Sequence, residues 1–344
     1  MNRKLAGTIQ LTLTALIWGV AFVAQKAGMD YVGPWTFNCT RFVIGGTVLI
    51  PVVLLFRPKR TAEELAAGTG KTPGNTAGAG GKSNPDCTAG RSEEPAERNS
   101  KRMKMTIVGG ILSGLCLASA SLFQQYGIIE TSVGKAGFIT ALYIILVPFL
   151  SIFLKKKTGL FQWLSAVIAV VGFYVMSIRG YESINRGDLL LLVCALLFSV
   201  QILVIDRFVE HANPIAMSCV QFFTSAVVCL GGMIAERPSM QSLLDAKVPI
   251  LYAGVMSCGI AYTLQLVGQK NLPPTPASLL MSLESVWSAI AGFVILHQTL
   301  SKQEILGCVL VFTGVILAQL PTRSKNGTAG NEKELSDGTE CDMI

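Results

Sequence analysis

The fold of this chain is decided by one heptapeptide near its start and a second that repeats it, Leu13-Thr14-Ala15-Leu16-Ile17-Trp18-Gly19 and Val193-Cys194-Ala195-Leu196-Leu197-Phe198-Ser199. The second begins 180 residues after the first. The same offset, without a gap, aligns three further pairs: Pro34 with Pro214, Cys39 with Cys219 and Phe42 with Phe222. Chance matches are frequent in apolar sequence, but a proline before the second apolar stretch of each half is harder to obtain by chance. The chain is therefore predicted to contain two repeats.

Later in each half the offset changes to 144, which aligns Gln125 with Gln269 and Thr131 with Thr275. Each half contains five apolar stretches. Because five is an odd number, the second half must begin on the opposite side of the membrane from the first. Inverted repeats of this kind recur among secondary transporters, whose substrate sites lie near the bilayer midplane between the repeats.

The composition indicates a membrane protein. Hydrophobic residues make up 51% of the chain and charged residues 14%, whereas roughly a quarter of the residues in a soluble domain are charged. About twenty helical residues cross a bilayer core, and a helix satisfies its own backbone polar groups there. We therefore predict an all-α integral membrane protein with ten transmembrane helices in two inverted five-helix repeats. The expected spans are Leu5–Ala24, Trp35–Phe56, Thr106–Ile129, Ser132–Leu154, Leu160–Ile178, Gly187–Ile205, Pro214–Ala235, Val248–Gln269, Thr275–Leu296 and Lys302–Leu320.

The organisation along the chain follows from these spans. The first repeat covers residues 1–180 and the second covers residues 187–320. Residues 60–100 are mostly small, polar or charged, so they cannot bury enough apolar surface to offset the entropy of ordering. We expect a disordered cytoplasmic loop there, and a disordered cytoplasmic tail of the same character at residues 321–344.

The basic residues predict the orientation. If the N-terminus is cytoplasmic, the inside segments hold Arg3, Lys4, most Lys and Arg of the long loop, Lys155-Lys156-Lys157, Arg207 and Lys270. The outside segments hold fewer: Lys26, Lys135, Arg179, Arg186, Arg237, Lys247 and Lys302. This bias predicts a multi-pass protein of the cell membrane with both termini in the cytoplasm. The net charge of +7 is then a topology signal, and we expect the lipid bilayer, not nucleic acid, as the partner.

Several blocks of sequence resemble a known family. They include Ala15-Leu16-Ile17-Trp18-Gly19-Val20-Ala21-Phe22, Arg41-Phe42 with Gly45-Gly46, Gln125-Tyr126-Gly127-Ile128 and, most specifically, Pro276-Ala277-Ser278-Leu279-Leu280-Met281-Ser282-Leu283-Glu284. The chain thus resembles the EamA-type carriers of the drug/metabolite transporter superfamily over about 8–180 and 187–320. The resemblance implies ten helices, a central cavity and alternating access without ATP. One departure is His297-Gln298, where the family usually carries Gly-Glu, so any role of that glutamate is in doubt here.

Glu284 is the first candidate for substrate binding. It is the only acidic residue deep within the expected spans, and a carboxylate within a membrane is costly unless it faces a cavity or a partner. Nine residues after Thr275, at 1.5 Å each, it should lie near mid-membrane. Glu284 either binds a cationic group of the substrate or exchanges protons, because desolvation disfavours the charged carboxylate. The alternative is a structural carboxyl group that holds two helices together.

Arg41 is the only basic residue well inside a span. Three interpretations remain open: it contacts an anionic group of the substrate, it pairs with Glu130, or it extends to the membrane surface. Other polar and aromatic side chains would complete a cavity: Trp18, Gln124, Gln125, Thr140, Tyr143, Gln201, Gln221, Tyr262, Gln265, Ser282 and Trp287. We select Glu284, Gln125, Gln201, Trp18, Tyr143 and Arg41 as the substrate-binding residues. Interhelical hydrogen bonding and packing are the ordinary alternatives.

Other classes of function find less support. The spans contain no HExxH, no GxSxG and no paired aspartates, and His211 and His297 lie at span ends, so we expect no enzyme, no metal and no cofactor. A channel would ordinarily carry a repeated pore loop or a ring of like charges. A signalling or structural membrane protein is the remaining alternative, although the chain has no sizeable soluble domain to be signalled through.

The sequence therefore favours a secondary transporter that exports a small polar or amphipathic metabolite, with proton coupling as an option that rests on family analogy. One further motif is Gly110-Ile111-Leu112-Ser113-Gly114, a GxxxG. Small residues at this spacing allow close helix approach. The sequence does not choose between packing inside one chain and packing in a homodimer.

Overall fold

The computed structural model describes residues 3–55, 95–131, 133–154, 160–177, 185–296 and 302–318. Within these ranges the chain is helical apart from short connections, and no β-strand occurs. Eight segments are long and apolar enough to cross a membrane: Arg3–Gly28, Pro34–Leu55, Asn99–Glu130, Ala136–Phe153, Arg186–Val209, Pro214–Glu236, Lys247–Gln269 and Pro274–Ile295. The chain is thus an all-helical, multi-pass membrane protein.

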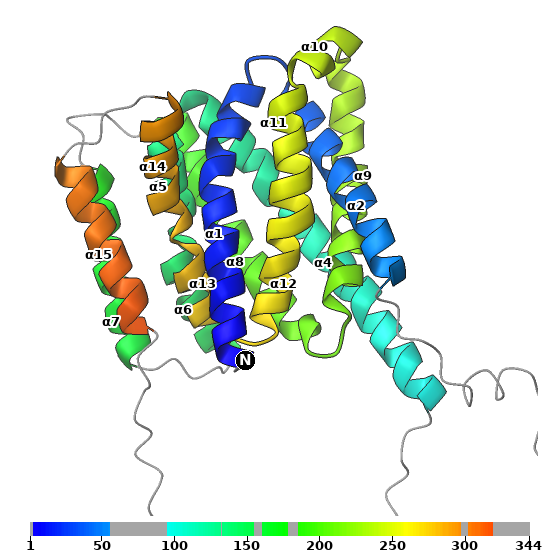
Figure 1. Ribbon diagram of the computed structural model, residues 1–344, viewed down its shortest axis with the longest axis horizontal. Coiled ribbons are helices and arrows are strands. Elements are labelled where there is room, and N and C mark those ends of the chain that lie inside the picture. Colours follow the sequence, from blue (N-terminus) through cyan, green and yellow to red (C-terminus); the bar gives the residue numbers. More distant parts are fainter. Residues whose placement is uncertain are drawn as a thin grey trace, which may run out of the picture.

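The helices run side by side as one bundle (Figure 1). In chain order they are α1 (Arg3–Gly28), α2 (Pro34–Leu55), α4 (Pro95–Glu130), α5 (Val133–Thr140), α6 (Tyr143–Phe153), α7 (Leu160–Ser177), α8 (Arg186–Val209), α9 (Pro214–Glu236), α10 (Met240–Asp245), α11 (Lys247–Leu251), the π-helix η1 (Tyr252–Tyr262), α12 (Thr263–Gln269), α13 (Pro274–Met281), α14 (Glu284–Leu296) and α15 (Lys302–Ala318). The main packing pairs are α4 with α8 and α9, α2 with α9 and η1, and α1 with η1, α12 and α14. At one edge α7 packs against α15.

The helices agree closely with the expected spans. Eight of the ten spans coincide with the eight apolar segments, and α7 and α15 occupy the fifth and tenth spans as helices that are not among those eight. One expectation is wrong in part, because the end of the 60–100 stretch, from Pro95 to Ser100, already belongs to α4. Glu97 in its first turn favours a helix start, and the Glu97 carboxylate lies 3.4 Å from the Lys101 amine one turn later. The earlier part of this loop, the tail at residues 321–344 and His297-Gln298 lie outside the described residues.

The GxxxG motif packs inside the chain. A Cβ atom built on Gly110 would lie 2.6 Å from Cβ of Val220, and one on Gly114 would lie 2.6 Å from the backbone oxygen of Gln221. The Ser225 hydroxyl of α9 donates to the Gly114 carbonyl oxygen at 2.8 Å. The small-residue face of α4 is therefore occupied by α9 of the same chain.

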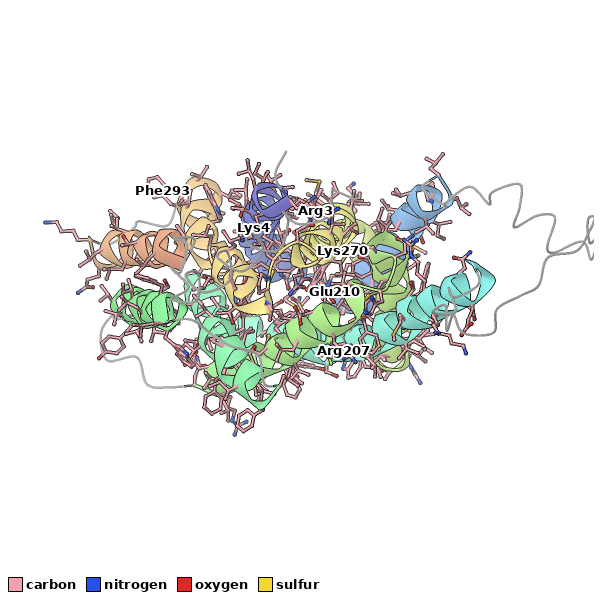
Figure 2. All side chains as sticks on the ribbon, turned by 90° about the horizontal axis from the view of Figure 1, so that it is seen from below. Arg3, Lys4, Arg207, Glu210, Lys270 and Phe293 are labelled. Atoms are coloured by element: carbon pink, nitrogen blue, oxygen red, sulfur yellow. The ribbon has the colours of Figure 1, made fainter. Side chains whose placement is uncertain are left out.

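The two ends of the bundle carry different groups. Figure 2 views one end, where Arg3, Lys4, Arg207 and Lys270 gather together with Glu210. We call this the Arg3 end. The basic residues of the sequence predict the same grouping, because all four were assigned to one side of the membrane. The opposite end of α1 carries Lys26, and α10 lies at that end too (Figure 1). We call it the Lys26 end.

Two polar clusters join helices at the Lys26 end. The Lys26 ammonium on α1 donates to the Ile128 and Ile129 carbonyl oxygens at 2.7 and 2.9 Å, so it satisfies orphan carbonyls at the end of α4. The Glu236 carboxylate at the end of α9 accepts from the backbone N–H groups of Trp35 and Thr36 at 3.1 and 2.8 Å. It thereby caps the start of α2, where helix N–H groups have no intrahelical partner.

Two of the membrane-crossing segments are broken near their middle. The break between α5 and α6 falls at residues 141–142, and the break between α13 and α14 falls at residues 282–283. Around the second break, four fully buried serines donate from their hydroxyls to the carbonyl oxygen three residues earlier, at 2.7–2.9 Å: Ser278, Ser282, Ser285 and Ser288. Such bonds compete with the helical ladder and bend a helix. In α6, Pro148 removes a further backbone donor.

Candidate functional site

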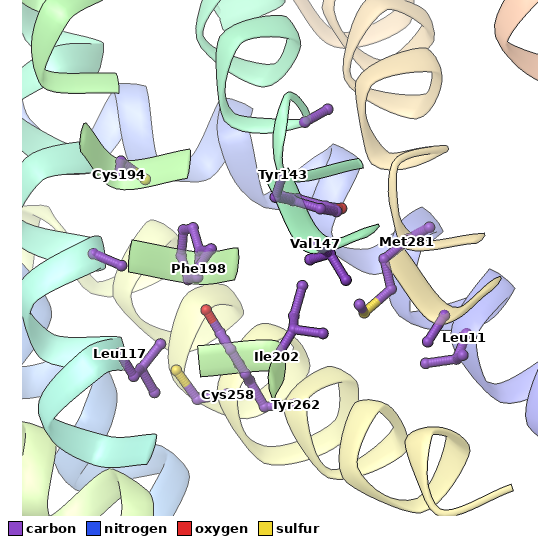
Figure 3. Packing of buried hydrophobic residues seen from close by; sticks show 14 of the residues in the cluster. Leu11, Leu117, Tyr143, Val147, Cys194, Phe198, Ile202, Cys258, Tyr262 and Met281 are labelled. Atoms are coloured by element: carbon purple, nitrogen blue, oxygen red, sulfur yellow. The ribbon is translucent and has the colours of Figure 1, made fainter. Parts of the chain in front are cut away.

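A pocket with about 430 Å³ of space between atoms, open solvent included, lies among the helices. It is lined by Trp18, Phe22, Gln25, Arg41, Gln124, Thr140, Tyr143, Phe198, Gln201, Ile202, Ser257, Tyr262, Gln265, Met281 and Glu284. These residues come from seven of the eight apolar segments, all except α9. Most of the membrane-crossing segments thus contribute to the pocket. Figure 3 shows five of its lining residues gathered around one region: Tyr143, Phe198, Ile202, Tyr262 and Met281.

The two helix breaks deliver side chains to this pocket. Thr140 ends α5 and Tyr143 begins α6, while Met281 ends α13 and Glu284 begins α14, and all four line the pocket. Because Glu284 lies at the start of a helix of 13 residues, the positive end of the helix dipole favours its carboxylate. Interrupted helices that present their ends to a central site are a recurring device of transporters.

Glu284 is buried, with 4% of its surface exposed. Among the residues that the structure describes, it forms no ion pair. The Tyr143 side chain interacts electrostatically with its carboxyl group. Glu284 is therefore a desolvated acidic group with the Tyr143 phenol as a polar neighbour.

Arg41 is the most deeply buried charged residue of the site, at 1% exposed. Its Nε and Nη2 atoms have no hydrogen-bond acceptor among the described residues, and it forms no ion pair there. The guanidinium carbon lies 4.9 Å from the Phe42 ring centroid and 5.8 Å from that of Phe37. These cation–π contacts offset part of the burial cost. They leave the Nε and Nη2 donors without an acceptor among the described residues.

An aromatic series runs from Arg41 across to Trp18. Phe42 stacks on Phe222 with ring centroids 6.2 Å apart, and Phe222 meets Tyr262 edge to face at 5.8 Å. Tyr262 in turn lies 4.6 Å from Trp18. Aromatic pairs at these separations attract one another beyond their buried area. They form a continuous set of aromatic contacts between Arg41 and Trp18.

Amide side chains supply neutral polar groups. Gln201 is completely buried, and neither its Nε2 nor its Oε1 has a hydrogen-bond partner within the described part of the chain. The Oε1 atom of Gln265 is also unpartnered, as is the indole Nε1 of Trp18. Buried polar atoms are nearly always satisfied in folded proteins by protein groups, water or a ligand. Several unsatisfied atoms around one pocket therefore indicate a site prepared to receive polar groups.

The structure brings together five of the six residues selected from the sequence: Glu284, Gln201, Trp18, Tyr143 and Arg41 all line the pocket. Gln125 lies outside it, buried, with its Nε2 donating to the Met29 sulfur at 3.4 Å. Its neighbour Gln124 lines the pocket instead. Successive helical residues point about 100° apart, and here Gln124 faces the cavity while Gln125 contacts Met29.

Two interpretations of Arg41 are wrong. With 1% exposure it does not extend to the membrane surface, and it makes no ion pair with Glu130, which is itself exposed. Three other cavity candidates, Gln221, Ser282 and Trp287, do not line the pocket. The side-chain nitrogens of Gln221 and Trp287 are nevertheless buried and have no hydrogen-bond partner among the described residues. For Lys135 the structure describes the helix but not the side chain.

Sequence reasoning missed six lining residues: Phe22, Gln25, Phe198, Ile202, Ser257 and Met281. Most are apolar or small, and such residues fill every span, so composition does not distinguish them. The internal repeat could have found one. At the 180-residue offset, Phe198 aligns with the predicted site residue Trp18.

Comparisons with known proteins agree with this architecture. The sequence model of the EamA-like transporter family matches residues 5–69, 90–178 and 185–320. An uncharacterized transporter of Archaeoglobus fulgidus is 24% identical over 92% of this chain and 87% of its own length. The uncharacterized transporter YoaV of Bacillus subtilis is 22% identical over 92% and 97%.

A solved crystal structure has the same fold, with a TM-score of 0.66 and 18% identity over 91% of this chain and 96% of that one. The family model accounts for most of the chain and covers all the helices that build the pocket. Both of these named relatives are called transporters. This chain belongs to the EamA-like transporter family.

Proposed function

We propose that this protein is a secondary active transporter that carries a small polar or amphipathic metabolite across the cell membrane, and that the metabolite binds in the central pocket. The observation that carries the proposal is the group of buried polar atoms that have no partner among the described residues and lie around one pocket inside a membrane bundle. Unsatisfied polar groups are expensive in a hydrocarbon environment. A polar ligand that visits the pocket would repay this cost.

Ten membrane helices in two inverted repeats form part of the proposal. Equivalent elements of the two halves pack in matching ways. The equivalent helices α2 and α9 lie against each other, as do the equivalent helices α7 and α15. Helix α1 packs on η1 and α12, and its equivalent α8 packs on α4, the equivalent of η1 and α12. Equivalent positions also face the pocket in pairs: Trp18 with Phe198 and Phe22 with Ile202 at the 180-residue offset, and Thr140 with Glu284 at the 144-residue offset. A site between two such halves is suited to alternating access.

The polar clusters at the Lys26 end support a closed state on that side. Gln25 and Gln124 line the pocket. Lys26, the residue that follows Gln25, donates to the carbonyl oxygen of Ile128, which lies one helical turn after Gln124. Opening toward the Lys26 end requires this bond to break. We propose that substrate leaves the pocket on this side after the two halves move relative to each other.

We assign the Arg3 end to the cytoplasm, because Arg3, Lys4, Arg207 and Lys270 gather there (Figure 2) and basic residues favour the cytoplasmic side. Both termini would then be cytoplasmic. Movement from the Arg3 end to the Lys26 end is export. Glu284 is the group through which we propose coupling to protons, because it is the acidic residue that lines the pocket.

The test is counterflow in proteoliposomes. A metabolite is first identified by comparing the culture medium of a strain lacking the protein with that of a strain overexpressing it. Vesicles preloaded with the unlabelled metabolite should then accumulate the labelled compound transiently, with saturation. Linear, non-saturating flux without counterflow would indicate a channel. No flux of any compound that differs between the strains would contradict transport.

A further inference from the structure

Helices α2 and α9 meet through two residues that occupy the same position in the two halves. At the 180-residue offset Phe42 corresponds to Phe222. Their rings stack with centroids 6.2 Å apart and planes 17° apart, and both side chains are fully buried. A residue contacts its own counterpart only close to the twofold axis that relates two repeats. The Phe42–Phe222 stack therefore marks the axis of the proposed inverted repeats.

Two thiol hydrogen bonds cross the same interface as a matched pair. The Cys39 thiol on α2 donates to the Ala226 carbonyl oxygen on α9 at 3.6 Å. The Cys219 thiol on α9 donates to the Gly46 carbonyl oxygen on α2, also at 3.6 Å. The 180-residue offset converts the first pair of residues into the second. Thiols are weak donors, so the bonds matter here for their geometry, in which each is the image of the other.

The helices on either side of this interface repeat the relation. A Cβ atom built on Gly114 of α4 would lie 2.8 Å from Cβ of Thr224 on α9. One built on Gly254 of η1 would lie 2.8 Å from Cβ of Ile44 on α2. Ile44 and Thr224 correspond at the 180-residue offset. The packing of α4 on α9 is therefore the image of the packing of η1 on α2.

This symmetry has a consequence for a carrier whose two halves exchange conformations when its site changes sides. The second state is then the twofold image of the first. A distance between two residues in the second state equals the distance between their counterparts in the first. The phenylalanine stack maps onto itself, and the two thiol bonds of equal length exchange places. The spacing of α2 and α9 is therefore the same in both states.

The Lys26 contact lacks such an image. At the 180-residue offset Lys26 corresponds to Asp206. An ionised carboxylate only accepts hydrogen bonds, so it cannot reproduce the bonds from Lys26 to the Ile128 and Ile129 carbonyl oxygens. By the same rule of exchange, these bonds belong to one state and not to both. The Lys26 end is thus a part that moves, and the α2–α9 interface is a part that does not.

Given the proposed function, we propose that α2 and α9 form the fixed pivot of the transport cycle. The interface around Phe42 and Phe222 stays closed in both states, while the contacts that close the Lys26 end form and break. The lining of the pocket agrees with this division. Of the eight apolar segments, the one that contains α9 contributes no lining residue, and α2 contributes Arg41 alone. These two helices support the pocket more than they build it.

The experiment locks this interface and measures transport. Full-length protein that keeps Cys39 as its only native cysteine carries Ala226→Cys, and a short, membrane-permeant bifunctional thiosulfonate joins the two thiols in proteoliposomes. Counterflow of the metabolite identified from the two strains is measured before cross-linking, after it and after reduction. A cross-link across a moving interface holds one state and stops the cycle. A cross-link across a fixed interface does not.

The matched comparison is a cysteine-free protein with Lys26→Cys and Ile129→Cys, in which the cross-link takes the place of the Lys26 bond. Mass spectrometry measures the extent of cross-linking in both proteins. We expect counterflow to change by less than about twofold when Cys39 is joined to Ala226→Cys, and to fall at least about tenfold when the Lys26 end is joined. Reduction should restore the second protein.

The pivot is overturned if joining Cys39 to Ala226→Cys stops counterflow and reduction restores it, a result that leaves the proposed transport function intact. It is also overturned if these two thiols do not cross-link under conditions that join the comparison pair. A second measurement needs no transport. The cross-linking rate of Cys39 with Ala226→Cys should be the same with and without Lys26→Met, and a change of more than about threefold would overturn the pivot. Absence of counterflow before any cross-linking would instead reject transport.

Discussion

The Thr36 hydroxyl donates to the Glu236 carboxylate at 2.6 Å, although the two residues are 200 positions apart. The same carboxylate accepts from the backbone N–H groups of Thr36 and Trp35. One side chain at the end of α9 thus satisfies donors at the start of α2. Because Arg41 lies on α2 less than two turns further along, this contact also fixes the helix that carries the buried cation.

Removal of this cap should lower stability. Glu236→Ala removes three hydrogen-bond acceptances and a negative charge at a helix N-terminus, so we expect a loss of about 1–3 kcal/mol. Glu236→Gln keeps one acceptor oxygen and should lose less. The melting temperature of the detergent-purified protein measures this, with the exposed Glu210→Ala as control. An equal melting temperature for the Glu236→Ala and Glu210→Ala variants would refute the role of the cap.

The Lys26 contact should control access to the pocket from its own end. In Lys26→Met the carbonyl oxygens of Ile128 and Ile129 lose their donor, so the state open at the Lys26 end becomes more populated. A cysteine placed at Gln124 in a cysteine-free background should then react faster with an impermeant maleimide from that side. Lys247→Met, which removes an exposed lysine, should leave the rate unchanged. A rate unaffected by Lys26→Met would show that this contact does not close the pocket.

Two glycines offer a matched pair for helix packing. Gly114→Ala places a Cβ atom 2.6 Å from the Gln221 carbonyl oxygen, whereas Gly231→Ala on α9 meets nothing within 4 Å. We expect the first to destabilise by about 1–3 kcal/mol through overpacking. The second should be neutral or stabilise by up to about 1 kcal/mol, because alanine favours helix. Melting temperatures that are equal for the two variants would contradict the close packing of α4 on α9.

Glu284→Gln should abolish transport while the protein still reaches the membrane. The glutamine keeps the shape of the side chain but neither binds a cationic group nor carries a proton. Counterflow and membrane abundance are measured together, with Glu210→Gln as the control. Wild-type counterflow in Glu284→Gln would remove Glu284 from the mechanism and restore its structural interpretation.

The spans could be predicted from the sequence because the length of an apolar run is fixed by the bilayer, whatever the neighbouring helices do. The breaks at residues 141–142 and 282–283 could not. The second break is surrounded by serine hydroxyls that bond to the chain three residues earlier, such as Ser282 to Leu279, and a serine in a span can equally bond elsewhere. The apolar lining residues, such as Phe22 and Met281, could not be predicted either, because the sequence does not show which apolar side chains of a span face a pocket.

The charged residues of the site were predictable for a different reason. A charge in an apolar span is rare enough to indicate a cavity, which selected Glu284 and Arg41. Hydropathy does not tell which way a polar side chain faces, however. Gln124 and Gln125 are adjacent and identical, and only packing decides that Gln124 lines the pocket while Gln125 contacts Met29.

The most direct test of a central, alternately exposed site is the accessibility of one pocket residue from both sides of the membrane. Gln201 is completely buried and lines the pocket, so Gln201→Cys in a cysteine-free protein is the probe. In oriented vesicles we predict that an impermeant maleimide labels it from either face, and that transported substrate slows both reactions. Labelling from one face only, or labelling that substrate does not affect, would contradict the account.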